Sequence, residues 1–325
     1  MNAGTRYIRS LSVAMLLVLA FTTLPHSAGA QIGGEPGAFS RLGFGARGMA
    51  MGNAMSAVTS GDVVAYYNAA LTPSAMYRHA SASFGILSLD RRLNFVSYTQ
   101  PLRPKAGISI GIINAGVSEI DGRDSDGRQT GALRTSENQI FLGFAVRPAD
   151  ALQLGVTLKL YYYQLYTDVA STTVGIDFGA LYRAGNGVDV ALTVRDINSR
   201  YKWDTSTLFG QNGQTTEDVF PLLITGGVAL TLPDSIALIS AEVEASNRSS
   251  VIVRAGVEAP LVPAFAVRAG IDRVDLKGEG TGVRPSFGFT ARTSIGSWTP
   301  ALHYALVLEP FSPSPIHMIS LSVAF

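Results

Sequence analysis

Few side chains in this 325-residue sequence have the type and spacing that chemistry requires. There is no cysteine, which excludes thiol nucleophiles, disulfide frameworks and cysteine-ligated metals. His79, His303 and His317 are far apart in the sequence, and none has a metal-ligand partner four residues further on. The spelling G-x-G-x-x-G at residues 43–48 lacks the preceding strand of a dinucleotide site. We therefore expect no enzyme activity, no metal site and no cofactor.

The composition is unlike that of an ordinary soluble enzyme. Only 15% of the residues are charged and 47% are hydrophobic, whereas soluble domains carry roughly 25% charged residues. The 25 basic and 24 acidic residues nearly cancel, so the sequence predicts no basic surface for nucleic acid.

The N-terminus has the order of a secretion signal. Arg6 and Arg9 precede an apolar stretch at 11–24, and small residues follow at 28–30. The alternative is a membrane anchor, but the uninterrupted apolar run is shorter than the ~20 residues that span a bilayer. We expect residues 1–30 to be a signal peptide that is cleaved before Gln31, so that the mature protein works outside the cytoplasm.

Further along the chain, hydrophobic residues recur at every second position. Between Leu152 and Leu160 each second residue is Leu or Val, and the residues between them are Gln, Gly, Thr and Lys. The same alternation occurs at 108–112, 188–194 and 251–257. Because strand side chains point to opposite faces in turn, each segment has one aliphatic face and one small or polar face.

This alternation fits a soluble sandwich or a membrane barrel, and three features favour the barrel. The segments are about ten residues long, as tilted membrane-crossing strands are. Few charges fall on the aliphatic face, and the opposite face is rich in small residues. Backbone groups in lipid must be paired, which strands achieve only in a closed sheet. The predicted fold class is all-β, a transmembrane antiparallel barrel spanning residues 80–325.

The barrel is expected to have about fourteen strands, because short turns alternate with longer connections along the chain. Long loops are expected at 118–136 and 196–220, and both chain ends are expected on the periplasmic side. Phe325 ends an alternating segment and resembles the C-terminal assembly signal of bacterial outer-membrane barrels. The expected strands are 80–88, 92–100, 105–116, 137–148, 151–165, 172–184, 187–196, 221–232, 235–245, 250–260, 263–272, 283–294, 297–308 and 316–325.

Residues 31–79 do not alternate and are rich in small side chains. Small residues let backbones approach closely, so we expect this segment to pack inside the lumen as a plug, with a short helix at 50–58. The alternative is a disordered periplasmic tail, which the apolar content of the segment disfavours.

Part of this segment resembles the N-terminal signature of the PorV/PorQ family. That family consists of outer-membrane barrels related to the FadL-type transporters of hydrophobic compounds, which have fourteen strands and an N-terminal plug. The chain departs from the usual motif at Asn53 and Ala69, and Tyr67 stands where Trp is usual. The matching plug-motif residues are Gly45, Ala46, Arg47, Met51, Gly52, Ala54, Tyr67, Asn68 and Ala70.

The strand faces opposite the aliphatic ones carry charges, which the pattern assigns to the barrel interior. They could form a selectivity path for solutes, or a balanced set of ion pairs that stiffens a plugged barrel. Equal numbers of the two signs favour pairing and predict low ion conductance. These lumen charges are Lys159, Asp177, Arg183, Asp189, Arg195, Glu242, Glu244, Arg254, Glu258, Arg268, Asp272 and Arg292.

The PorV/PorQ resemblance implies a scaffold or adaptor associated with type IX protein secretion. Its partners would be outer-membrane lipid, secretion-system subunits and exported proteins. Candidate exposed anchors in the second long loop are Trp203, Leu208 and Phe209, with folding back onto the barrel rim as the alternative. The alternative is a FadL-like transporter whose partners are hydrophobic small molecules. A third reading is a structural membrane protein with no transport role.

Overall fold

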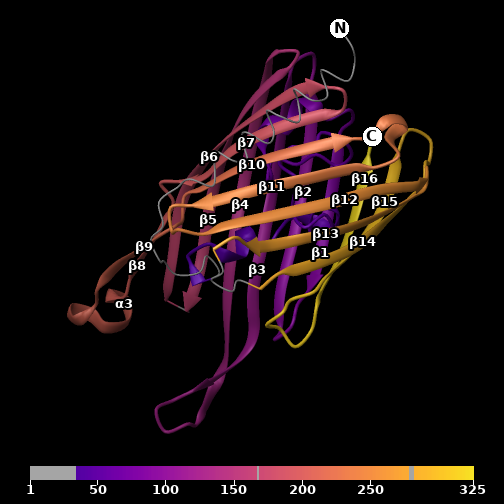
Figure 1. The fold of residues 1–325 in the computed structure, drawn as a ribbon. Coiled ribbons are helices and arrows are strands. Elements are labelled where there is room, and N and C mark those ends of the chain that lie inside the picture. Colours follow the sequence, from indigo (N-terminus) through magenta and orange to yellow (C-terminus); the bar gives the residue numbers. More distant parts are fainter. Residues whose placement is uncertain (1–33, 167, 278–281) are drawn as a thin grey trace.

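The computed structural model describes residues 34–166, 168–277 and 282–325; the predicted signal peptide lies outside them. Fourteen antiparallel strands close into a barrel in the order β1-β16-β15-β14-β13-β12-β11-β10-β7-β6-β5-β4-β3-β2 (Figure 1). Neighbours in the barrel are neighbours along the chain, except that β7 pairs with β10 and β1 with β16. The predicted fold class is therefore confirmed.

Each strand expected from the alternation has its counterpart in the barrel. The bounds are β1 (His79–Ile86), β2 (Arg91–Leu102), β3 (Ala106–Arg123), β4 (Gln129–Ala149), β5 (Leu152–Tyr166), β6 (Val169–Gly185), β7 (Val188–Ile197), β10 (Leu223–Thr231), β11 (Leu238–Ser246), β12 (Val251–Val262), β13 (Phe265–Asp275), β14 (Arg284–Arg292), β15 (Thr299–Val307) and β16 (Ile316–Ala324).

The two connections expected to be long loops contain regular structure, so the sequence prediction was wrong there. The β3–β4 hairpin continues to Arg123 and resumes at Gln129, projecting beyond the neighbouring strands (Figure 1). Its projecting part is polar, so the aliphatic alternation that marks the other strands ends before it does. The second connection forms β8 (Arg200–Asp204), α3 (Ser206–Phe209), η5 (Gly210–Asn212) and β9 (Thr215–Val219), with β8 and β9 paired.

The barrel has an aliphatic outside and a polar inside. Leu158 is 50% exposed, whereas the side chain of its neighbour Lys159 is only 5% exposed. Exposed Ile, Leu, Val and Phe residues recur on the outer faces of the barrel strands. A closed sheet with such a surface needs a hydrocarbon environment, because a soluble protein rarely exposes apolar patches of this extent.

Replacing Leu158 by Arg tests this belt. The residue lies in the middle of β5, so we expect the change to destabilise the membrane-inserted barrel by ~2–4 kcal/mol. Urea unfolding in lipid vesicles measures the loss, and Leu158→Met is the control with an apolar side chain of similar size. An equal stability of the two variants would contradict the membrane position of this face.

Both chain ends of the barrel meet at one end, which we call the turn end. Arg78 and Phe325 exchange backbone hydrogen bonds there, with N–O distances of 3.1 and 2.9 Å. The connection of Asn186 and Gly187 between β6 and β7 also lies at this end. The opposite end, the loop end, carries the β3–β4 and β8–β9 hairpins (Figure 1).

The residues before β1 form short helices rather than strands. They are η3 (Ala38–Arg41), α2 (Gly45–Ala50) and η4 (Ala69–Ser74); η6 (Pro233–Ser235) lies between β10 and β11. The helix expected at 50–58 is wrong in position, because Gly52 and Asn53 adopt left-handed backbone angles and end α2. No helix in the described residues is long and apolar enough to cross a membrane.

Candidate functional site in the barrel lumen

The N-terminal segment, residues 34–78, packs against the inner face of the barrel over most of its circumference. Helix α2 contacts β13, β14, β15, β16 and β1, whereas η4 contacts β2 to β6. Phe44 and Tyr66 lie in a buried aromatic cluster with Phe95 of β2 and Phe141 of β4. The segment therefore links opposite walls of the barrel.

Glycines on both surfaces make this close packing possible. A Cβ on Gly256 or Gly270 would lie 2.3 and 2.4 Å from backbone atoms of Met51. Gly52 has a φ of 61°, and a Cβ there would come within 2.5 Å of the Ile271 carbonyl oxygen. No larger residue fits these contacts without displacing backbone, which gives the plug-motif Gly52 a structural reason.

Arg47 is the charged residue of the plug motif, and it reaches the wall. Its Nε and Nη2 atoms donate to the two carboxylate oxygens of Glu258 at 2.9 and 3.0 Å, and Nη1 donates to the Ser60 carbonyl at 2.7 Å. Burial alone would lower the pKa of Arg47, but the adjacent Glu258 carboxylate outweighs it and raises that pKa. Arg268 donates to the same carboxylate at 2.5 Å, so Glu258 joins two cations.

Two buried tyrosines hold the segment in its own shape. The Tyr66 hydroxyl donates to the Ser40 carbonyl at 2.8 Å, and the Tyr67 hydroxyl donates to the Phe44 carbonyl at 3.0 Å. Burial raises the pKa of Tyr66 to about 12 and that of Tyr67 well above its usual value, so both hydroxyls remain donors at neutral pH. Gly48 leaves room for Tyr67, because a Cβ there would lie 2.0 Å from the hydroxyl oxygen.

Asn68 of the plug motif begins η4. Its side-chain oxygen accepts a hydrogen bond from Ala70 N at 2.9 Å, and its amide nitrogen donates to the carbonyls of Ser56 and Ala180 at 2.9 and 3.3 Å. Asn68 thus caps a helix and joins it to β6. The remaining motif residues Gly45, Ala46, Met51 and Ala54 lie along the same packed stretch, where Ala46 N donates to the Ser320 hydroxyl at 2.8 Å.

Successive residues of the segment reach further wall carboxylates. Asn53 Nδ2 donates to Asp272 at 3.2 Å, Ser56 N donates to Glu242 at 2.5 Å, and Thr59 Oγ1 donates to Asp189 at 2.8 Å. Together with the Arg47–Glu258 pair, these contacts join the segment to β7, β11, β12 and β13. The segment is therefore attached by polar contacts spaced along its length.

Asp62 is a further residue of the N-terminal segment that contacts the barrel wall, in this case two histidines. Its carboxylate oxygens lie 3.3 Å from His79 Nε2 and 3.2 Å from His303 Nε2. His303 also contacts the hydroxyls of Thr290 and Ser322, at 2.6 and 2.8 Å. The spacing of these histidines in the sequence did not indicate that they lie close together. They are on β1 and β15, and the closed barrel places only β16 between these strands.

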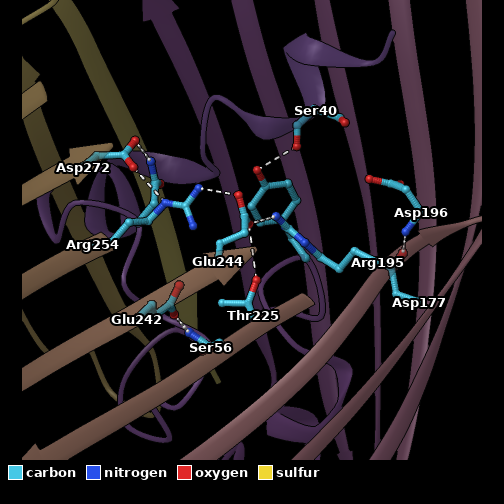
Figure 2. Close-up of polar contacts among 12 residues, drawn as sticks. Ser40, Ser56, Asp177, Arg195, Asp196, Thr225, Glu242, Glu244, Arg254 and Asp272 are labelled. Carbon is cyan, nitrogen blue, oxygen red and sulfur yellow. Dashed lines mark hydrogen bonds and ion pairs between the residues drawn. The ribbon is translucent and has the colours of Figure 1, made fainter. Parts of the chain in front are cut away.

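The wall charges pair with one another behind the segment. Arg254 donates to Asp272 at 2.7 Å and to Glu244 at 3.0 Å, and Arg195 donates to the other Glu244 oxygen at 2.9 Å (Figure 2). The side chain of Glu244 is only 2% exposed. This arrangement alternates signs across β7, β11, β12 and β13, with the uncharged strand β10 between β7 and β11, and these residues form no one-sign ring for ion selection.

A second cluster includes a residue that the alternation missed. Lys159 lies 2.6 Å from Asp177 and 3.0 Å from Asp196, and Tyr161 donates to Asp196 at 2.6 Å. Strict alternation would turn Asp196 outward beside the inward Arg195. A register shift between β6 and β7 and a φ of 60° at Asp196 bring both side chains inside.

Three further residues singled out in the sequence analysis, Arg183, Arg292 and Phe325, lie nearer the turn end. Arg183 donates to the Ser74 hydroxyl at 2.7 Å, which again links wall and segment. Arg292 is exposed and donates to the Pro263 carbonyl at 2.8 Å, so it lies outside the lumen network. The ring of Phe325 packs between Tyr98 and Trp298, with centroid distances of 6.5 and 5.8 Å.

The lumen around these contacts is tightly filled. The cavity beside Glu244 and Arg254 has a volume of about 20 Å³, and the one beside Asp62 and His303 has about 30 Å³. Each has room for little more than one water molecule, whereas small-molecule pockets measure roughly 300–1,000 Å³. A solute entering either place must displace part of the N-terminal segment.

No protein-family model matches the chain, and neither does any curated protein sequence. Its fold is similar to that of the CymD monoaromatic hydrocarbon channel, with a TM-score of 0.64 and 11% identity over 87% of this chain and 97% of that one. The Pseudomonas putida toluene transporter TodX gives 0.60 and 11% over 87% and 96%. A Pseudomonas aeruginosa FadL homologue gives 0.59 and 10% over 86% and 98%. The chain thus shares the fold of FadL-type channels almost from end to end.

Proposed function

We propose that this protein is an outer-membrane channel for hydrophobic small molecules, held closed by its N-terminal segment acting as a plug. The observation that carries the proposal is the fourteen-stranded barrel with a packed N-terminal segment, shared over nearly the whole length of channels for monoaromatic hydrocarbons and toluene. Within this proposal the turn end, with both chain ends, faces the periplasm, and the loop end faces outward.

The polar lumen is consistent with such a channel because its charges pair with one another. Hydrophobic solutes need no charged selectivity ring, and the wall charges instead hold the plug. Contacts such as Asn53–Asp272 and Thr59–Asp189 are single hydrogen bonds to carboxylates, each with a net value of ~1.5–3 kcal/mol. Because these contacts are separate along the segment and the barrel strands pair with one another, the plug can shift in part without unfolding the barrel.

Uptake of radiolabelled toluene tests the proposal. Cells of a bacterial host without FadL-type channels, expressing the full chain, are expected to take up toluene faster than cells with an empty vector. Glucose uptake serves as the control and should not change, because the lumen is filled. Equal toluene uptake with and without the protein would count against a channel for hydrophobic compounds.

A second candidate is the adaptor role that the PorV/PorQ resemblance implies. The β8–β9 hairpin projects from the loop end and exposes Leu208 and Phe209, the latter by 62% (Figure 1). Trp203 was expected to be a third exposed anchor, but it is only 8% exposed, and its ring packs against Tyr163 and Tyr201. The resemblance rests on the N-terminal motif, and the exposed pair on this hairpin is a surface feature that suits a protein partner.

Affinity purification from crosslinked outer membranes distinguishes the adaptor from the channel. An adaptor should recover secretion-system subunits or exported proteins, and Leu208→Ser/Phe209→Ser should lose them. The matched control is Leu261→Ser/Val262→Ser, an exposed pair at the turn end. Recovery of neither kind of protein by the wild type would contradict the adaptor role.

A further inference from the structure

The membrane-facing surface is hollowed along β1, where outward side chains are small. Ala80 and Ala82 face outward between larger register partners on both neighbouring strands. The resulting trough has a volume of about 550 Å³ and an almost wholly apolar lining. The lining continues over Ile110 and Ile112 of β3 to Ile140 of β4, so the trough crosses neighbouring strands. Strands lie about 4.8 Å apart, so a trough of this extent is wide enough for a hydrocarbon chain. The flanking partners are Tyr98 and Val96 on β2, and Val323 and Leu321 on β16.

The trough opens toward the turn end. On the loop-end side, the next outward residues of β1 are Phe84 and Ile86, both large and both 51% exposed. Their side chains cover the outer face of β1 beyond the two alanines, so the trough is closed on that side. On the other side the strand begins at His79, and the outward position before Ala80 belongs to Arg78, which is exposed.

Basic residues surround this open end. Arg78 lies directly before β1, and Arg103 and Lys105 lie exposed in the turn between β2 and β3. Arg103 Nη2 donates to the Met76 carbonyl at 3.2 Å, which places this turn beside the start of β1. Residues 76–82, 96–106 and 321–325, which make up this part of the barrel, include no Asp or Glu.

Aromatic side chains mark the same level as a membrane interface. Tyr98, Phe325 and Trp298 form a row of neighbouring rings at the turn end. Aromatic residues favour the headgroup region, where one side of the ring is apolar and the other is hydrated. The basic residues therefore lie where lipid phosphates lie, and the trough lies where acyl chains lie.

We propose that this trough binds an anionic phospholipid, with one acyl chain over Ala80 and Ala82 and the phosphate against Arg78, Arg103 and Lys105. Basic side chains beside the membrane surface attract anionic headgroups, and the small side chains of Ala80 and Ala82 leave the chain a fixed place. The site is on the outside of the barrel and is independent of the proposed channel function.

Native mass spectrometry of the delipidated full chain tests this site with phosphatidylglycerol and phosphatidylcholine as probes. The wild type should retain a phosphatidylglycerol adduct and retain less phosphatidylcholine. Ala82→Phe, which fills the trough, should lose the adduct. The matched control is Ala291→Phe, an exposed outward alanine on β14, which should keep it.

The headgroup contact has its own variants. Arg78→Gln/Arg103→Gln/Lys105→Gln should lose the preference for phosphatidylglycerol, whereas Arg292→Gln, an exposed turn-end arginine elsewhere, should keep it. Equal retention by Ala82→Phe and Ala291→Phe would overturn the trough as the acyl site. An unchanged lipid preference in the triple variant would overturn the phosphate contact. Heat-shifted gel mobility confirms that each variant is folded before it is compared.

Discussion

Deleting the N-terminal segment, residues 34–76, is expected to turn a silent barrel into a steady ion channel. The segment fills the lumen between opposite walls, and its removal leaves a fourteen-stranded barrel with Lys159, Glu244 and Arg254 facing water. In planar bilayers the full chain should show no large, steady openings, whereas the deletion variant should show them continuously.

The control for this deletion shortens the β8–β9 hairpin instead, by replacing residues 206–213 with a short glycine linker. That variant keeps the lumen contacts and should stay silent. Steady large openings from the full chain, equal to those of the deletion variant, would mean that the segment does not close the barrel.

Replacing Glu244 by Leu is expected to produce the largest loss of stability from a single side chain. Glu244 is the common partner of Arg195 and Arg254 and is almost fully buried. Removing one member of a buried ion pair leaves an uncompensated charge, which costs ~3–5 kcal/mol. Urea unfolding of the barrel in detergent measures this free energy.

Glu217→Gln provides the matched comparison, because Glu217 pairs with Arg200 where both side chains are 46% exposed. Such exposed pairs contribute ~0–1 kcal/mol, so this variant should unfold almost like the wild type. In Arg195→Met/Glu244→Leu the orphaned guanidinium is gone, and part of the loss should be recovered. A Glu244→Leu variant as stable as Glu217→Gln would show that the network carries no net stability.

The barrel could be predicted from the sequence because lipid imposes a simple rule on each strand. Leu152 to Leu160 alternate with polar residues since one face contacts hydrocarbon and the other contacts the lumen. Asp196 breaks the rule through a local register shift that single-residue alternation cannot reveal. The Tyr201–Trp203 alternation of β8 was too short to identify as a strand among polar neighbours.

The pairing inside the lumen was beyond sequence reasoning. Arg47 and Glu258 are 211 residues apart, and only barrel closure brings them together. The geometry also explains why the motif could not decide the function. Its residues Gly52 and Asn68 satisfy packing and capping needs inside the barrel. Such needs arise in any barrel that holds this segment, whether it works as an adaptor or as a channel.

The most direct test of the account is to lock the segment to the wall and measure toluene uptake. The chain has no native cysteine, so Thr59→Cys/Asp189→Cys can be joined selectively by a short bismaleimide, or by oxidation where the two thiols meet. Asn114→Cys/Asn138→Cys, a register pair within the wall, is the control for crosslinking itself. We expect the locked segment to abolish uptake, reduction of the oxidised pair to restore it, and the wall crosslink to leave it unchanged. Undiminished uptake by fully crosslinked Thr59→Cys/Asp189→Cys protein would contradict a plug that must move.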